Sequence, residues 1–194
     1  ALVLPEATDS ERGQPFSREQ EAAILRAATG GPWHLPCIVA RWTGLRYGDI
    51  ARLAWTDIDT AAGVIRLRPR KTARHGIQVT IPIVDPLAQA LQTARSEATA
   101  SAQHVFPAHA ASYPRPEHKS GPGPFAAVLQ AANVSPDEYT FHSWRHTFRT
   151  RLAEAGVSDD LAKRLGGWTS ETTAARYDHA ARIDELRRAL ERAT

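Results

Sequence analysis

The stretch FHSWRHTFRT, residues 141–150, decides how the rest of this sequence is interpreted. Its large apolar residues Phe141, Trp144 and Phe148 recur at helical spacing, which predicts an amphipathic helix with a buried aromatic face. The same helix carries an unusual number of imidazole and guanidinium groups: His142, Arg145, His146, Arg149 and Arg151. The question is which ligand such a cluster, placed where a helix begins, would hold.

Outward from this stretch, the sequence predicts an α+β chain that is mainly α-helical with one small sheet. A capping box at residues 17–20 opens a helix that runs to about Thr29, and a second helix ends at Gly44. Alternation with a period of two predicts an antiparallel β-hairpin over residues 63–68 and 77–83, within a sheet of two or three strands. Further helices are predicted over residues 47–55, 85–98, 125–134, 143–156, 158–166, 170–180 and 182–194.

Two local features refine these elements. Asp85 is predicted to cap the N-terminus of the helix over 85–98, with Pro86 in its first turn. Residues 106–124 are rich in Pro, Gly and His and are predicted to form a loop. The N-terminal residues 1–15 are interpreted as a linker from a preceding domain, and residues 16–194 as one domain.

Composition limits the classes of protein that fit. The 194 residues are 42% hydrophobic and 23% charged, as expected of a globular domain. No apolar run approaches the roughly 20 residues of a membrane span, and the N-terminus lacks the pattern of a signal peptide. The single cysteine, Cys37, is predicted to fill the core. These features favour a cytoplasmic protein.

The positive charge of the chain comes almost entirely from arginine, since only three of its 24 cationic residues are lysines. Arginine binds phosphate groups through a planar fork, whereas lysine acts as a point charge. Residues 60–84 contain five cations and no acid: Arg66, Arg68, Arg70, Lys71 and Arg74. A solvated face would explain this run, but charge of one sign on a hairpin fits a polyanion better.

Several residues are candidates for binding an anion. Arg46 begins a helix just after Gly44, where backbone donors and a guanidinium can converge. His142 and Arg145 lie three apart on one helix face and can contact the same phosphate. His142 and His146 have a spacing that metal sites use, but no acid or cysteine cluster accompanies them and Arg145 would repel a cation. No metal site is therefore predicted.

The segment LGGWTSETTAARYDH, residues 165–179, contributes a tryptophan and a tyrosine, Trp168 and Tyr177. Taken singly, each of these residues has an ordinary structural explanation: Trp168 as a packing anchor and Tyr177 as a half-buried helix residue. The same holds for Lys71 as a turn residue at the tip of the hairpin.

Taken in order, TGLRYGDI, RKT, HSWRH and LGGWTSETTAARYDH closely resemble the tyrosine recombinase (phage integrase) family, over the part of the chain that corresponds to the family's catalytic domain. The resemblance covers residues from about Phe16 to the end and implies the fold of that catalytic domain. Asp49 stands where the family usually has Glu in a supporting role, and Trp144 replaces a commoner Leu within the pair motif. The implied catalytic residues are Arg46, Lys71, His142, Arg145, Trp168 and Tyr177.

The resemblance also implies an activity: site-specific cleavage and rejoining of double-stranded DNA through a 3′-phosphotyrosyl bond, without metal, ATP or another cofactor. The implied partners are DNA, further copies of the chain as a tetramer on DNA, and a host DNA-bending factor. Tyr177 would be the nucleophile, and Arg46 and Arg145 would stabilise the charge of the transition state. Lys71 would protonate the departing 5′ oxygen. The arginines expected to contact DNA outside the catalytic set are Arg66, Arg68, Arg70, Arg74 and Arg149.

Other readings of the sequence remain. Residues 152–177 resemble a helix-turn-helix, so a DNA-binding regulator without catalysis is one alternative. A topoisomerase of type IB would use related chemistry, and a binding protein descended from a recombinase is a third. The regulator leaves Arg46, Lys71 and His142 without a role.

Overall fold

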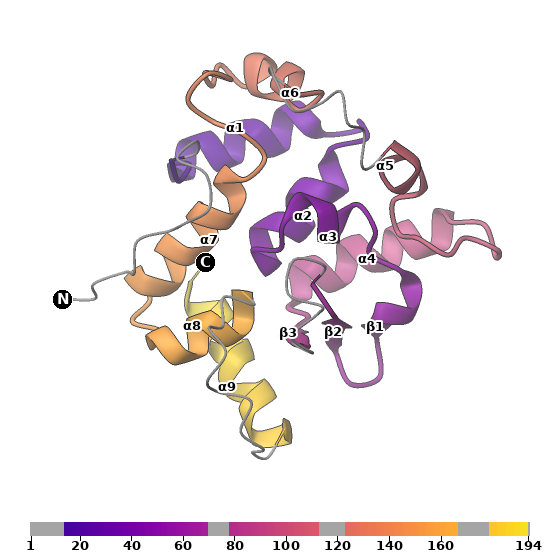
Figure 1. Ribbon diagram of the computed structural model, residues 1–194, viewed down its shortest axis with the longest axis vertical. Coiled ribbons are helices and arrows are strands. Elements are labelled where there is room, and N and C mark those ends of the chain that lie inside the picture. Colours follow the sequence, from indigo (N-terminus) through magenta and orange to yellow (C-terminus); the bar gives the residue numbers. More distant parts are fainter. Residues whose placement is uncertain (1–13, 70–77, 113–122, 167–178, 194) are drawn as a thin grey trace.

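The computed structural model describes residues 14–69, 78–112, 123–166 and 179–193. The described part is mainly helical with one three-stranded antiparallel sheet, as the sequence predicts (Figure 1). The strands are β1 (Ile58–Asp59), β2 (Val64–Leu67) and β3 (Val79–Pro82) in the order β1-β2-β3. Central pairs such as Ile65 with Ile81 hold β2 and β3 in register.

The first two helices begin and end where their sequence predicts. Helix α1 (Arg18–Ala28) has Ser17 as its N-cap, and the Ser17 and Gln20 side chains complete the capping box. Helix α2 (His34–Thr43) ends at Gly44, which adopts the left-handed conformation with φ 59°. The core of the molecule lies where α2 packs on α4 (Asp85–Glu97) and on α7 (Ser143–Glu154).

The remaining helices cover the two ends of the molecule. In Figure 1, α6 (Ala126–Ala131) lies beside α1 at one end, while α8 (Asp159–Gly166) and α9 (His179–Arg192) lie toward the other. Both α8 and α9 contact β3. Leu186 and Leu190 of α9 are buried. These two leucines therefore pack on the rest of the described chain rather than facing outward.

Three expectations about local structure are wrong. The third helix, α3, spans only Tyr47–Ile50, because the backbone beyond it pairs with another segment: Val105 N–H donates to the Leu53 carbonyl at 2.8 Å. Within the stretch predicted as a loop, Pro107–Ser112 form helix α5, with buried His109. The N-cap of α4 is Val84 rather than Asp85, which sits in the first turn.

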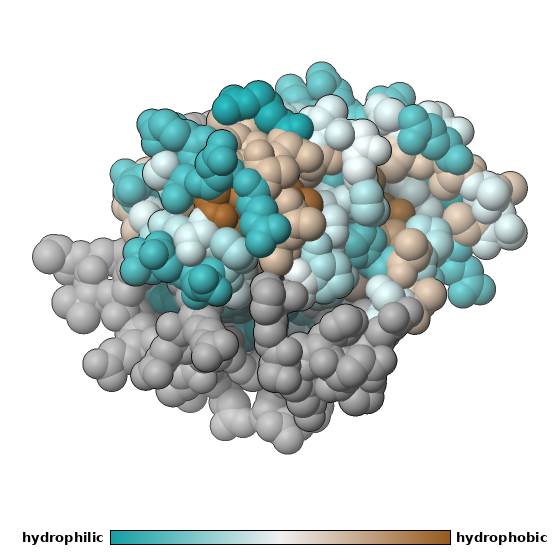
Figure 2. Space-filling view, turned by 90° about the horizontal axis from the view of Figure 1, so that it is seen from above, coloured by the Kyte–Doolittle hydropathy of each residue, from teal (hydrophilic) through white to brown (hydrophobic). Residues whose placement is uncertain are grey.

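The buried side chains form one continuous core. Trp144 and Phe148 of α7 are 1% and 3% exposed and belong to it, as the helical spacing predicts. Cys37 is fully buried, and burial raises the pKa of its thiol to about 12. The face shown in Figure 2 is mostly hydrophilic, with small hydrophobic areas among its coloured residues. No helix in the described segments is both long and apolar enough to span a bilayer.

Candidate active site

The start of α7 carries two of the sequence-predicted residues, His142 and Arg145. His142 is the N-cap of α7 and is half-buried, and its backbone N–H donates to Thr140 Oγ1 at 3.2 Å. Its ring makes an edge-to-face contact with the ring of His146, with centroids 5.0 Å apart. No group of three metal-ligating side chains occurs within the described residues.

Arg145 is buried and is held by a hydrogen bond to the backbone. It is 3% exposed, and its Nη1 donates a 2.7 Å hydrogen bond to the carbonyl of Gly44. A hydrogen bond from a charged group to a buried carbonyl is among the stronger ones in a protein. The bond ties α7 to the end of α2, two residues before Arg46. The fold therefore brings the segments that carry Arg46 and Arg145 together.

Arg46 is the N-cap of α3 in an extended conformation, with φ −68° and ψ 148°, and it is half-buried. Gly44 forces the sharp turn that places Arg46 there. A Cβ atom at Gly44 would lie 2.3 Å from Cδ1 of Phe148, so only glycine fits against α7. Asp49, the expected supporting residue, lies in the first turn of α3 and is half-buried.

A hydrogen-bonded pair that the sequence did not suggest supports the same turn. The Tyr47 hydroxyl lies 2.9 Å from Nδ1 of His109, and Nε2 of His109 lies 2.9 Å from the Pro32 carbonyl. Because a carbonyl only accepts, Nε2 carries the proton, and in the neutral ring Nδ1 accepts from Tyr47. The Tyr47 ring also packs against Phe141, next to His142, with centroids 5.1 Å apart. The residues flanking Arg46 and His142 are thus packed against each other.

The arginines predicted on the hairpin do not share one environment. Arg66 donates from Nη1 to the Asp59 carboxylate at 2.5 Å across the β1–β2 pairing, whereas Arg68 is exposed. Asp59 lies one residue before the acid-free run, so the run has an acid beside it in space. Arg149 of α7 is half-buried. The remaining predicted residues lie outside the described part of the chain: Arg70, Lys71, Arg74, Trp168 and Tyr177.

One cation of α7 has a role that the sequence did not indicate. Arg151 faces α1 and pairs with buried Glu21, with 3.3 Å between Nη1 and Oε2. Arg41 of α2 pairs with the same oxygen through Nε at 2.9 Å. Burial lowers the pKa of Arg151, Glu21 raises it, and the neighbouring cations Arg41 and Arg18 lower it further. The arginines of α7 therefore do not all converge on one ligand.

Comparison with known proteins places this chain in a family. The model of the phage integrase family matches residues 12–182, so the chain belongs to that family. It is 30% identical over 183 residues to the integrase of Escherichia phage HK022. The aligned region covers 88% of this chain but only 48% of the phage protein. The chain thus spans about half the length of the relatives it matches.

Solved structures share the fold. One structure of the Tn1549 transposon integrase (residues 82–397, R225K) in complex with a circular intermediate DNA has a TM-score of 0.67 at 23% identity. The superposed region covers 95% of this chain and 68% of the transposon integrase chain. A lambda integrase tetramer bound to a Holliday junction has a TM-score of 0.61 at 23% identity. The superposed region covers 90% of this chain and 53% of the lambda integrase chain. These likenesses confirm the predicted fold.

Proposed function

We propose that this chain is the catalytic domain of a site-specific DNA recombinase that cleaves and rejoins strands through a covalent 3′-phosphotyrosyl bond. The observation that carries the proposal is the junction of α2, α3 and α7, where Arg145 is bonded to Gly44 beside Arg46, in a member of the phage integrase family. In this proposal, both guanidinium groups act on one phosphate at this junction. His142, one turn before Arg145, lies on the same end of α7.

The chemistry follows from the charge that develops during the reaction. Attack of a tyrosine oxygen on a phosphodiester gives a pentavalent transition state with added negative charge on the non-bridging oxygens. Guanidinium groups fixed in advance stabilise that charge more than the ground state. Arg145 suits this role because its hydrogen bond to Gly44 holds it before the substrate arrives. We assign the nucleophile to Tyr177, the proton donor to the 5′ oxygen to Lys71, and a further phosphate contact to Trp168.

The wider assembly belongs to the same proposal. We propose that a DNA-binding domain precedes residue 16, that residues 1–15 link the two, and that copies of the whole protein act as a tetramer on two DNA duplexes. The tetrameric lambda integrase on a Holliday junction supports this arrangement. A cytoplasmic location and a host DNA-bending factor complete the proposal. A regulator that only binds DNA explains Arg68 but gives Arg46 and His142 no task.

The decisive experiment compares three forms of the protein on one labelled, nicked suicide substrate carrying the recognition site. Wild type is expected to form a covalent adduct on a denaturing gel, and Tyr177→Phe is expected to form none while binding DNA equally well. Tyr139→Phe is the matched control, because the Tyr139 ring stacks on Phe16 at 5.3 Å and serves packing. An adduct in Tyr177→Phe, or no adduct in wild type, would refute the proposal.

A further inference from the structure

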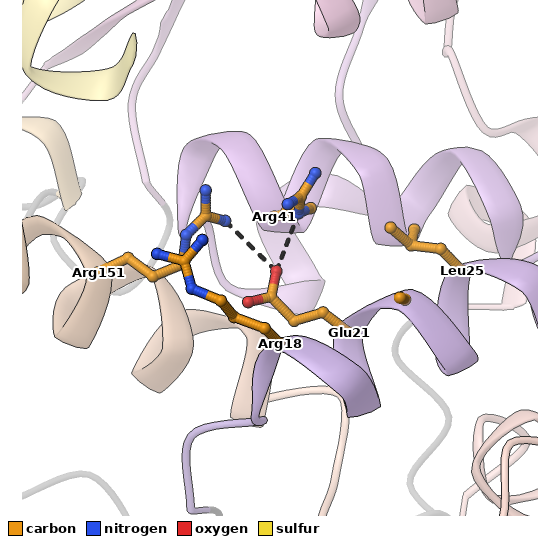
Figure 3. Close-up of a pocket in the computed structure, with 6 residues that line it drawn as sticks. Arg18, Glu21, Leu25, Arg41 and Arg151 are labelled. Atoms are coloured by element: carbon orange, nitrogen blue, oxygen red, sulfur yellow. Dashed lines mark hydrogen bonds and ion pairs between the residues drawn. The ribbon is translucent and has the colours of Figure 1, made fainter. Parts of the chain in front are cut away.

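A pocket of about 170 Å³ lies on the surface between α1, α2 and α7. Its charged lining consists of three arginines and one glutamate, shown in Figure 3: Arg18, Glu21, Arg41 and Arg151. The charged side chains that line the hollow are thus mainly cationic, and Glu154 adds a second negative charge near Arg151 from outside the lining.

Several strong donors of this pocket have no acceptor among the described residues. Glu21 Oε2 accepts from Arg41 Nε and from Arg151 Nη1, and Arg151 Nε donates to the Ala193 carbonyl at 2.6 Å. Within the part of the chain that the structure describes, the two Nη groups of Arg41 and the Nη2 of Arg151 donate to no protein atom. The Arg151 side chain is only 8% exposed, and it lines the pocket.

The pKa of Arg151 also reflects the concentration of positive charge in the pocket. Burial is the main cause that lowers the pKa of Arg151, and the charges of Arg41 and Arg18 act in the same direction. Glu21 and, to a smaller extent, Glu154 oppose this effect by raising the pKa of Arg151. An anion in the pocket would reduce the repulsion among the three arginines. The same anion would accept hydrogen bonds from the Nη groups of Arg41 and Arg151 that have no described acceptor.

We propose that this pocket binds one phosphate group. Guanidinium forks match the oxygens of phosphate in pairs, and the open donors of Arg41 and Arg151 belong to two such forks. The phosphate comes either from the backbone of bound DNA or from free inorganic phosphate. Binding itself does not depend on the proposed recombinase activity; only the assignment of the phosphate to DNA does.

The first test uses inorganic phosphate and the folded protein without DNA. At constant ionic strength, replacing chloride by phosphate is expected to raise the thermal unfolding midpoint and to shift the Nε–H NMR signals of Arg41 and Arg151. Arg41→Gln is expected to weaken phosphate binding about tenfold or more, since it removes charge-assisted donors. Arg26→Gln, on the exposed side of α1 outside the pocket, is expected to bind like wild type.

A second variant protects the test against loss of folding. Arg18 is exposed, so Arg18→Gln removes one pocket charge without disturbing the Glu21 pairs, and it is also expected to weaken phosphate binding. Absence of a phosphate-specific effect in wild type would overturn the proposal. Equal phosphate binding by wild type, Arg41→Gln and Arg18→Gln would overturn it too.

The third measurement identifies the source of the phosphate. The slope of log affinity for duplex DNA against log salt becomes shallower by about one unit for each phosphate contact that is lost. If Arg41→Gln loses phosphate binding and its DNA slope becomes shallower than that of Arg26→Gln, the phosphate belongs to DNA. If phosphate binding is lost but the DNA slope is unchanged, the pocket takes a free phosphate. Because neither readout needs strand cleavage, a failure here is distinct from a failure of the proposed activity.

Discussion

The guanidinium of Arg145 and the carbonyl of Gly44 are joined by a 2.7 Å hydrogen bond between residues 101 positions apart in the sequence. This bond fixes the start of α7 against the end of α2. It also leaves the position of Arg145 dependent on the turn that presents Arg46. A substitution at Gly44 or at Arg145 should therefore alter the positions of both Arg46 and Arg145.

Arg145→Lys keeps the charge but loses the planar fork that can bind Gly44 and a phosphate together. We expect cleavage of the suicide substrate to fall by about 10²–10³, the size of effect seen when an electrostatic donor is lost. The circular dichroism spectrum should stay that of wild type. Arg26→Lys, at an exposed position of α1, should cleave normally. Normal cleavage by Arg145→Lys would remove this arginine from the proposed site.

Gly44→Ala tests the steric argument for the turn. The added methyl would meet Phe148 at 2.3 Å, and the residue has φ 59°, so overpacking and backbone strain add together. We expect a loss of roughly 2–5 kcal/mol in the free energy of unfolding, measured by urea denaturation. Gly156→Ala is the matched control, since Gly156 has φ 70° but nothing within 4 Å of the new atom. A loss of about 1–2 kcal/mol is expected there. Equal losses would contradict the packing argument.

Cys37 gives stability a dependence on alkaline pH. The thiol has a pKa raised from 9.0 to about 12 by burial in the folded state, whereas the unfolded chain ionises near the ordinary value. Between these values the unfolded state binds fewer protons, so this group makes the protein less stable as pH rises, by about 1.4 kcal/mol per unit. Cys37→Ala lacks this contribution. Urea denaturation at pH 8 and pH 10 should show wild type losing about 1.4 kcal/mol more than the variant; equal losses would mean that the thiol also ionises in the folded protein.

Arg68 and Arg66 form a matched pair for DNA binding. Arg68 is exposed, whereas Arg66 is paired with Asp59. We expect Arg68→Gln to weaken binding to all DNA sequences alike and to reduce the salt slope by about one unit. Arg66→Gln should change the slope less, because that arginine has an internal partner. Fluorescence anisotropy across a series of salt concentrations measures both, and a larger effect at Arg66 would reverse the assignment.

The helices and the sheet could be predicted from sequence because their signals are local. The capping box at Ser17, the terminating Gly44 and the aromatic spacing of α7 each act within a few residues, and the structure has the corresponding elements. The short α3 could not be predicted, because its end is set by hydrogen bonds between residues 53–55 and 103–105. Such long-range pairing overrides local propensity.

The identities of the proposed site residues also came from the sequence by itself, through the resemblance of TGLRYGDI and HSWRH to motifs of the phage integrase family. Which arginines can act together was decided only by the tertiary structure. Arg145 and Arg151 lie on one helix, yet one is bonded to Gly44 and the other to Glu21. Asp59 reaches Arg66 only through strand pairing. A guanidinium takes its function from the acceptor that faces it, and for Arg145 and Arg151 that acceptor lies more than 100 residues away in the sequence.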